Sequence, residues 1–190
     1  DNPSLLIELG EAKYLQNDTK SADSLWNHVL LNYSKDEFIY RLLASCKLRY
    51  GLYDDAIEIL LNGRKNMANP NLYSEDLSAI YEAQRNYPAA VEEYLSQLKT
   101  NPNLFGIITI KIRGLAADSD QPEAIISVLK KQIKENPKQQ NLYEILGDIY
   151  IKFGKMPEAL DCYRTIGANN DDDGQSLISF ASRCYDSKAF

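Results

Sequence analysis

Apolar residues recur with the spacing of a helix in residues 142–166, which read LYEILGDIYIKFGKMPEALDCYRTI. Residues three and four apart share a helix face, and the first apolar stripe consists of Tyr143, Leu146, Gly147 and Tyr150. Gly154 interrupts this stripe, and Pro157 can begin a second helix because a first turn does not need the N–H that proline lacks. The second stripe consists of Ala159, Tyr163 and Ile166. The pattern predicts two helices joined by a tight turn, with their apolar stripes facing each other.

The same pair of stripes recurs along the chain. An alanine on the inner face lets two helices approach closely, and a large residue four positions later fills the space beside it. The marker alanines, whose successive spacings are 34, 34, 34 and 35 residues, are Ala22, Ala56, Ala90, Ala124 and Ala159. The large residues that follow them are Trp26, Leu60, Tyr94, Val128 and Tyr163. Five occurrences at a nearly constant period indicate a repeated helix pair, and we expect the extra residue of the last interval at the joint near residues 135–140.

The period and these residues resemble the tetratricopeptide repeat family, whose pattern is W-x2-L-G-x2-Y, followed by Ala, an aromatic residue and Pro. The resemblance covers nearly the whole chain and implies repeats at about 3–36, 37–70, 71–104, 105–139 and 140–173, with a partial sixth unit over 174–190. The fourth repeat departs most from the pattern, with Lys111 in place of a leucine and Ile112 in place of a small residue. The fold that the resemblance implies is all-α: a right-handed α-α superhelix (a solenoid) of stacked antiparallel helix pairs, with about eleven helices in a single array over residues 1–190.

The seven prolines support the same division without reference to the alanines. Three of them lie two residues before a marker alanine, where a second helix is expected to begin: Pro88, Pro122 and Pro157. The other four follow an asparagine at or just before a repeat boundary: Pro3, Pro70, Pro102 and Pro137. Because proline keeps the preceding residue out of helical geometry, these positions suit joints and not helix interiors.

Two segments need the repeat context to be interpreted. The run LFGIITIKI at 104–112 is rich in β-branched residues and would suggest a strand in isolation, but it occupies the register of a first helix, so we expect a helix. Residues 175–187 are expected to form an amphipathic helix whose apolar face consists of Leu177, Phe180, Ala181 and Cys184. This helix is either a capping helix for the end of the array or the first half of a truncated repeat.

The charge and hydropathy of the chain argue against several classes of partner. The 27 acidic residues outnumber the 21 basic ones and give a net charge of −6, whereas nucleic-acid binding draws on clustered Lys and Arg. The same argument disfavours the pentatricopeptide family, which reads single-stranded RNA. No apolar run reaches about 18 residues, so we expect no membrane insertion. We expect a soluble cytoplasmic or periplasmic protein that starts after a processed signal or inside a longer chain, because an initiator Met and a charged-then-apolar leader are both absent.

Candidate catalytic and metal-binding groups are sparse. The single histidine, His28, is expected on the outer surface of the first repeat, and there is no glycine-rich phosphate loop. The three cysteines lack the spacing of a zinc site and are expected to be small buried apolar residues, the alternative being one disulfide between Cys162 and Cys184. The three aspartates at 171–173 lack the alternating ligands and distal Glu of a calcium loop, so we expect them to cap the next helix. We therefore expect no enzyme, no metal site and no cofactor.

The remaining candidate for function is the surface. In the family that the chain resembles, the first helices line a concave groove, and positions 2, 5, 9, 12 and 13 of each repeat point into it. The corresponding candidate protein-binding residues are Tyr14, Phe38, Arg41, Ser45, Arg49, Glu75, Glu82, Arg113, Glu144, Asp148 and Lys152. Family members that grip a peptide's C-terminal carboxylate carry Lys and Asn at set positions, which no part of this chain supplies. Asp76 would in addition place a negative charge where such a carboxylate lies, so capture of chaperone tails is not supported.

The resemblance therefore implies a non-catalytic protein–protein interaction scaffold that binds a peptide or protein segment in the concave groove through several weak contacts. Two alternatives stay open. The groove could be a solvated face of a spacer module within a larger protein, for example an exported bacterial one. The array could instead self-associate as a homo-oligomer through the terminal helix.

Overall fold

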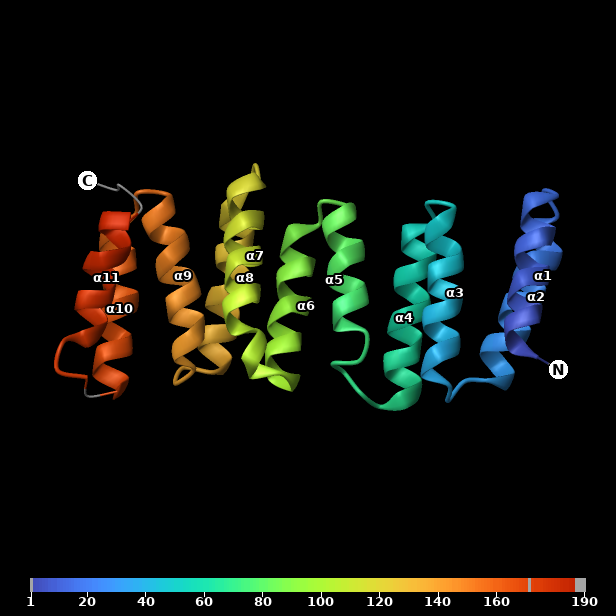
Figure 1. Cartoon of the computed structure of the whole chain (residues 1–190), viewed down its shortest axis with the longest axis horizontal. Coiled ribbons are helices and arrows are strands. Elements are labelled where there is room, and N and C mark those ends of the chain that lie inside the picture. Colours follow the sequence, from blue (N-terminus) through green and yellow to red (C-terminus); the bar gives the residue numbers. More distant parts are fainter. Residues whose placement is uncertain (1, 171, 187–190) are drawn as a thin grey trace. The chain divides into compact units, whose positions relative to one another are not determined.

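The computed structural model describes residues 2–170 and 172–186, and Figure 1 shows the chain as a series of helices. Within these residues there are eleven α-helices, one short 3-10 helix and no strand, so the predicted all-α class is confirmed. The chain divides into two compact units, Asp1–Gln84 (unit 1) and Arg85–Phe190 (unit 2). None of the helices in the described part is both long enough and apolar enough to cross a lipid bilayer.

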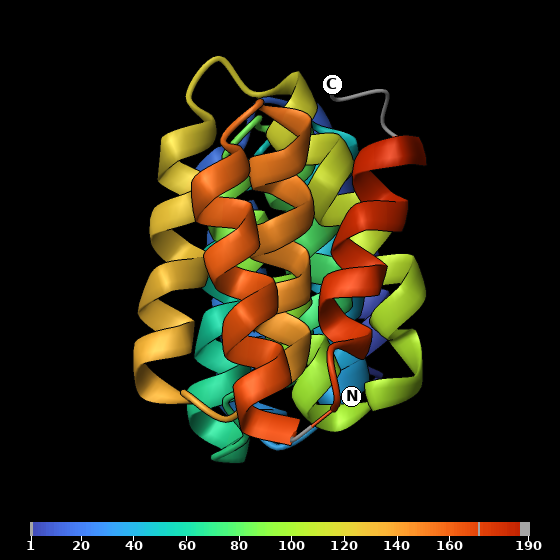
Figure 2. The ribbon, with the colours of Figure 1, turned by 90° about the vertical axis from the view of Figure 1, so that its left-hand side faces the viewer.

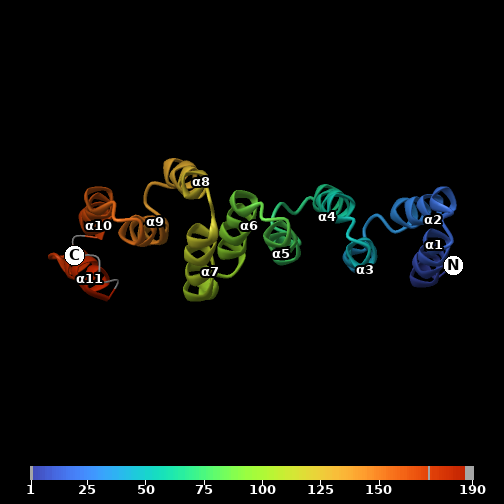
Figure 3. The same cartoon turned by 90° about the horizontal axis from the view of Figure 1, so that it is seen from above.

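Unit 1 consists of two closely packed helix pairs and one further helix. Its helices are α1 (Pro3–Leu15), α2 (Thr19–Asn32), α3 (Glu37–Arg49), α4 (Tyr53–Met67) and α5 (Ser74–Ala83). α1 packs against α2 and α3 packs against α4, while α3 also contacts α1 and α2. Seen from above, α1 and α3 line one side of the unit and α2 and α4 the other (Figure 3). The core of unit 1 contains Trp26, Tyr40, Leu43 and Leu77, all nearly inaccessible to solvent.

Unit 2 contains the remaining helices. They are α6 (Tyr87–Thr100), the 3-10 helix η1 (Pro102–Leu104), α7 (Phe105–Asp118), α8 (Pro122–Glu135), α9 (Gln140–Lys152), α10 (Met156–Asn170) and α11 (Gln175–Asp186). α9 pairs closely with α10 and also contacts α7 and α8, and α11 packs on both α10 and α9. Figure 2 shows α9, α10 and α11 side by side. The first helices of the fourth and fifth repeats, α7 and α9, line one side of the unit together with α11, and α8 and α10 lie on the other side (Figure 3).

Capping residues and prolines set the helix boundaries where the sequence predicts them. The Asp18 carboxylate accepts a hydrogen bond of 3.2 Å from the backbone N–H of Ser21 and so caps the start of α2. Asn2 and Asp36 cap α1 and α3 in the same way. All seven prolines lie in the first two positions of a helix or in a joint between helices. The LFGIITIKI run is helical, as predicted: Leu104 ends the 3-10 helix at 102–104, and residues 105–112 form the start of α7.

The turns inside the helix pairs share a backbone signature, with one exception. Four of the five turns contain a residue with left-handed backbone, a conformation that ends a helix and reverses the chain: Asn17 (φ 62°), Gly51 (71°), Arg85 (57°) and Gly154 (70°). In the α7–α8 turn the residue after α7, Ser119, has extended backbone instead, with φ −82° and ψ 131°. The turn of the fourth repeat therefore reverses the chain without a left-handed residue at this position.

The extra residue of the repeat pattern lies in α7, and our expectation of an insertion near residues 135–140 is wrong. The fully buried positions at the marker site are Ala22, Ala56, Ala90, Ile125 and Ala159, each 0% exposed. Ala124 is only half-buried, and Leu129 takes the buried place that we assigned to Val128. Leu129 and Tyr163 are 34 residues apart (163 − 129), so the joint between them holds no insertion. Ala124 and Ile125 are adjacent and both apolar, so the period alone could not show which of them faces inward.

A bulky residue at the small-residue position explains the looser fourth repeat. The equivalent buried positions of the first helices in successive repeats are Gly10, Ala44, Ser78, Ile112 and Gly147. Ile112 is 0% exposed and is the largest of these side chains. A larger side chain at this point holds two helices further apart, and α7 packs less closely on α8 than α9 does on α10.

The cysteines and the last helix complete the fold. Cys46, Cys162 and Cys184 are buried and free, so they are small apolar residues as predicted, and the alternative disulfide Cys162–Cys184 is not formed. Asp172 caps α11 by accepting hydrogen bonds from the backbone N–H groups of Gly174 (3.2 Å) and Ser176 (3.1 Å). Asp171, and residue 187 at the end of the predicted terminal helix, lie outside the described residues.

Candidate functional site

The first helices of unit 1 give the predicted groove residues different exposures. Phe38 is 62% exposed, and Ser45 and Glu75 are also exposed, whereas Tyr14 and Glu82 are half-buried. The Tyr14 ring lies 5.9 Å from that of Trp26 and 5.0 Å from that of Tyr50, measured between ring centroids. Tyr14 therefore contributes to the packing of α1 on α2 and α3 as well as to the surface.

Arg49, one of the predicted groove residues, forms a bidentate ion pair with Glu11 that joins α3 to α1. Its Nε donates to Glu11 Oε1 at 3.1 Å, and its Nη2 donates to Oε2 at 2.7 Å. The Tyr50 hydroxyl donates to the same Oε1 at 2.7 Å. The hydrogen bond from Arg49 holds the pKa of Glu11 below its ordinary value, and the one from Tyr50 acts in the same direction. These bonds tie two successive first helices together across their exposed side.

Arg41, a second predicted groove residue, is also engaged inside the chain. Its Nε donates to Asp76 Oδ2 on α5 at 3.0 Å, and its guanidinium lies 5.4 Å from the centroid of the Tyr73 ring. Asp76, which we expected to repel a ligand carboxylate, is thus paired with Arg41. Both predicted arginines of unit 1 link neighbouring repeats, which reduces what they can offer to a partner.

In unit 2 the predicted residues Arg113, Asp148 and Lys152 come together in one hollow, which we name the α7–α9–α11 hollow. Its volume is about 370 Å³, and its lining residues are Arg113, Asp148, Ile151, Lys152, Arg183 and Asp186. Arg113 lies on α7, while Asp148 and Lys152 lie on α9. The hollow therefore lies on the side of the first helices, and three helices of unit 2 form it.

Asp148 is the anchor of this hollow. Its side chain is only 3% exposed, and its Oδ2 accepts a hydrogen bond from Arg183 at 2.7 Å and a longer one from Arg113 at 3.4 Å. Its Oδ1 accepts a hydrogen bond from the Tyr163 hydroxyl at 2.9 Å. A buried carboxylate needs such partners to offset its loss of hydration, and here two arginines from different helices supply them. The arginines keep 45% (Arg113) and 37% (Arg183) of their side-chain surface exposed, so they are held in place and still face solvent.

Glu144, the remaining predicted residue, lies one turn before Asp148 and lines a different hollow of about 320 Å³ with Tyr163, Ser176 and other residues of α9, α10 and α11. It is half-buried. Burial raises the pKa of its carboxyl group, and the charge of Asp148 adds to that rise while Arg183 opposes it. The structure therefore separates Glu144 from the three residues that meet in the α7–α9–α11 hollow.

Arg183 also lines the hollow, although it is not one of the predicted groove residues. The sequence predicts α11 only as a capping helix or half of a truncated repeat, so the predicted groove residues include none on this helix. A signal was present in the sequence, because Arg113, Asp148 and Arg183 are successively 35 residues apart and alternate in charge. Equal spacing in a repeat array places residues on neighbouring helices at similar heights, which favours ion pairs between them.

The described residues contain no group of three or more His, Cys, Asp or Glu side chains placed to hold a metal ion. His28 is exposed on α2, as expected, and its carbonyl accepts a hydrogen bond of 2.8 Å from Asn32. The chemistry present in the α7–α9–α11 hollow is that of recognition: fixed cationic donors beside an apolar side chain, Ile151.

The chain shares several features with tetratricopeptide repeat proteins: helices that recur in pairs at a period of 34 or 35 residues, short reversing turns, and a small residue at the same buried position of the first helix in four of the five repeats. Over 121 residues it is 31% identical to the TPR repeat-containing protein MJ1428 of Methanocaldococcus jannaschii. That match covers 63% of this chain but only 21% of the relative, so it spans about a fifth of the relative's length. No family model matches the chain.

Among solved structures, the chain resembles MamA with a TM-score of 0.42 at 18% identity, over 87% of this chain and 96% of that one. It resembles TTC0263, a thermophilic TPR protein in Thermus thermophilus, with a TM-score of 0.41 at 18% identity, over 96% and 98% of the two chains. A MamA fragment from Desulfovibrio magneticus gives a TM-score of 0.46 at 12% identity, over 90% and 97%.

Proposed function

We propose that this protein is a non-catalytic interaction scaffold that holds a segment of another protein against its first helices, with the α7–α9–α11 hollow as the main anchor. The observation that carries the proposal is that Arg113 on α7, Lys152 on α9 and Arg183 on α11 line the same hollow. We also propose that the five repeats and α11 act as a single array over residues 1–190.

The electrostatics of the hollow suit a segment with mixed polar and apolar side chains. Asp148 neutralises part of the charge of its two arginines and orients them, so little side-chain entropy is lost when a partner binds them. Lys152 is exposed and adds a flexible cation at the rim, while Ile151 supplies an apolar wall. Several contacts of this kind are typical of grooves that hold peptide segments.

A peptide library selected on the whole chain tests the proposal. The enriched peptide would then be measured by fluorescence anisotropy against the wild type and against the double variant Arg113→Glu with Lys152→Glu. The matched control is Lys131→Glu with Lys134→Glu, which makes the same charge change on α8, away from the hollow. We expect the groove variant to bind at least about tenfold more weakly and the control to stay within about twofold. Failure to enrich any peptide, or an equal loss in both variants, would contradict anchoring at this hollow.

One observation favours self-association as a second candidate. The terminal helix α11 exposes 43% of Leu177, 59% of Ile178 and 72% of Tyr185. An apolar face of this kind at the end of a repeat array is a surface on which a second copy could pack. Light scattering over a hundredfold range of concentration would show a rising mass for this candidate, and Leu177→Lys would abolish the rise.

A further inference from the structure

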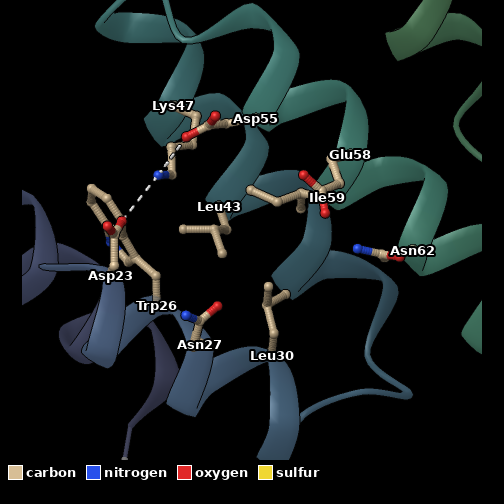
Figure 4. Close-up of a pocket in the computed structure, with 10 residues that line it drawn as sticks. All are labelled: Asp23, Trp26, Asn27, Leu30, Leu43, Lys47, Asp55, Glu58, Ile59 and Asn62. Carbon is tan, nitrogen blue, oxygen red and sulfur yellow. Dashed lines mark hydrogen bonds and ion pairs between the residues drawn. The ribbon is translucent and has the colours of Figure 1, made fainter. Parts of the chain in front are cut away.

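A second hollow lies in unit 1, among α2, α3 and α4, and no groove position of the repeats falls in it. We name it the α2–α4 hollow; its volume is about 230 Å³ (Figure 4). Its lining residues are Asp23, Trp26, Asn27, Leu30, Leu43, Lys47, Asp55, Glu58, Ile59 and Asn62. Because α2 and α4 supply most of this lining, the hollow belongs to the side of the second helices, away from the candidate groove.

The hollow already holds one cation, the ammonium group of Lys47. Lys47 is 7% exposed, and its Nζ lies 2.8 Å from Asp55 Oδ2, 3.5 Å from Asp23 Oδ1 and 4.1 Å from the centroid of the Trp26 ring. Figure 4 shows this ammonium between the two carboxylates, which come from α2 and α4. Two carboxylates and an aromatic face are the groups that stabilise a partly desolvated ammonium.

The charge of the hollow is not balanced by Lys47. Three carboxylates (Asp23, Asp55 and Glu58) and one ammonium leave a net charge of −2 (−3 + 1). Glu58 is exposed and forms no ion pair within the described residues, and Figure 4 places it beside Asn62, away from Lys47. The part of the hollow lined by Glu58 therefore keeps an unneutralised carboxylate.

The floor of the same region is apolar. Leu43 is 0% and Ile59 is 7% exposed, and Leu30 on α2 is half-buried. Asn27 and Asn62 at the rim offer amide oxygens as further acceptors. An aliphatic stem could cover Leu30 and Ile59 while its charged end reaches Glu58, which is how long basic side chains divide themselves between apolar and polar surroundings.

We propose that the α2–α4 hollow binds a lysine or arginine side chain presented by a partner protein. The excess negative charge of the hollow favours a cation, and its apolar floor favours a cation carried on an alkyl stem. The site is distinct from the α7–α9–α11 hollow, whose exposed charges are mainly basic, so the two hollows would engage segments of opposite charge.

The chain offers a specific probe, because Trp26 is its only tryptophan and lines this hollow. Glycine–serine nonapeptides that carry three arginines, three lysines or three norleucines would be titrated into the full chain while Trp26 fluorescence is followed. We expect a saturable change with arginine and lysine that weakens with added salt, and no saturable change with norleucine. Comparing the Kd values of the arginine and lysine peptides shows which basic side chain is preferred.

Two charge-reversal variants make the test specific for the site. Glu58→Lys removes the unpaired carboxylate, and Glu8→Lys makes the same charge change on an exposed glutamate of α1 that is not a candidate groove residue and lies in the same unit. We expect Glu58→Lys to raise the Kd of the arginine peptide about fivefold or more and Glu8→Lys to leave it within about twofold. Circular dichroism checks that both variants fold, and Glu58→Gln repeats the test with a smaller change. Equal losses in both variants, binding of the norleucine peptide, or no saturation would overturn the proposal.

Discussion

Gly147 and Tyr163 are in direct contact across the α9–α10 pair. A Cβ atom on Gly147 would lie 2.7 Å from Tyr163 Cε2, closer than real Cβ atoms approach a neighbour. Tyr163 is 1% exposed, and its hydroxyl is held by Asp148, so its ring has little freedom to move. The absence of a side chain at Gly147 is therefore what lets α9 and α10 pack closely at this point.

We predict that Gly147→Ala destabilises the protein by about 1–3 kcal/mol through overpacking, although alanine is the better helix former. The matched control is Gly114→Ala in α7, where a new Cβ meets no atom within 4 Å. That variant should be more stable by about 0.5–1 kcal/mol, because alanine lowers the entropy of the unfolded chain. Urea unfolding followed by circular dichroism measures both, and effects of the same sign would contradict the assigned packing.

Arg85 occupies a turn position at which two other repeats carry glycine. Its φ is 57°, close to the values at Gly51 and Gly154. A residue with a Cβ is strained in this conformation, so Arg85→Gly should stabilise the protein by about 0.5–1 kcal/mol. Ser119→Gly, in the turn with extended backbone, should instead destabilise it by about 0.5–1 kcal/mol. Glycine makes the unfolded chain more flexible, and it removes the Ser119 Oγ that accepts a hydrogen bond of 3.0 Å from the backbone N–H of Gln121. Thermal melting that shifts both variants in the same direction would argue against the different geometry of the fourth turn.

Two glutamates should give the stability opposite dependences on pH. The pKa of Glu11 lies below its ordinary value of 4.5 because Arg49 hydrogen-bonds the carboxylate, so its contribution is present above pH 4.5 and is lost as the pH falls through the folded-state pKa. The pKa of Glu144 lies above 4.5 because its carboxyl is desolvated, so the folded state binds its proton more tightly and stability falls as the pH rises through that range.

Replacing each glutamate by glutamine removes its own part of the pH dependence. Glu11→Gln should destabilise the protein at about pH 7 and have a smaller effect at about pH 4, whereas Glu144→Gln should stabilise it at about pH 7. Urea midpoints at both pH values provide the measurement. Destabilisation by Glu144→Gln at neutral pH would contradict this prediction, because it would mean that the folded protein stabilises the Glu144 carboxylate.

The three thiols should be protected in the folded protein. Burial raises the pKa of Cys162 to about 12, and it also raises the pKa values of Cys46 and Cys184. At about pH 8 the thiolate forms are scarce and shielded, so Ellman's reagent should react on the order of a hundred times more slowly than in denaturant. All 3 thiols should be detected after unfolding without a reductant. Detecting only one thiol in the protein unfolded without a reductant would mean that the other two cysteines form a disulfide.

The helices and their boundaries could be predicted from the sequence because they rest on local rules. The spacing of Tyr143, Leu146 and Tyr150 defines a helix face, and Gly154 with Pro157 defines a turn and a start. The register of the fourth repeat could not be predicted in the same way. Ala124 resembles the marker residue, and only the packing of its neighbour Ile125 in the core shows that the helix is rotated by one position.

The candidate sites were less accessible to sequence reasoning, because they depend on contacts between distant residues. Three of the predicted groove positions do meet in one hollow, but Arg49 and Arg41 are paired with Glu11 and Asp76, and the repeat pattern gives no sign of those bonds. Lys47 reads as an ordinary surface lysine on α3. Its burial follows from two carboxylates on α2 and α4 that happen to meet it, so the α2–α4 hollow could be found only from the structure.

Optical and chemical probes are distributed unevenly between the units. The only tryptophan is in unit 1, as is Cys46, while Cys162 and Cys184 are in unit 2. Indole emission therefore follows unit 1 during denaturation, and labelling resolved at Cys162 and Cys184 by mass spectrometry follows unit 2. If all repeats melt cooperatively, the two signals share one transition; if the coupling between neighbouring repeats is weak, the curves separate. A single unmutated sample can therefore show whether the two units unfold together or separately.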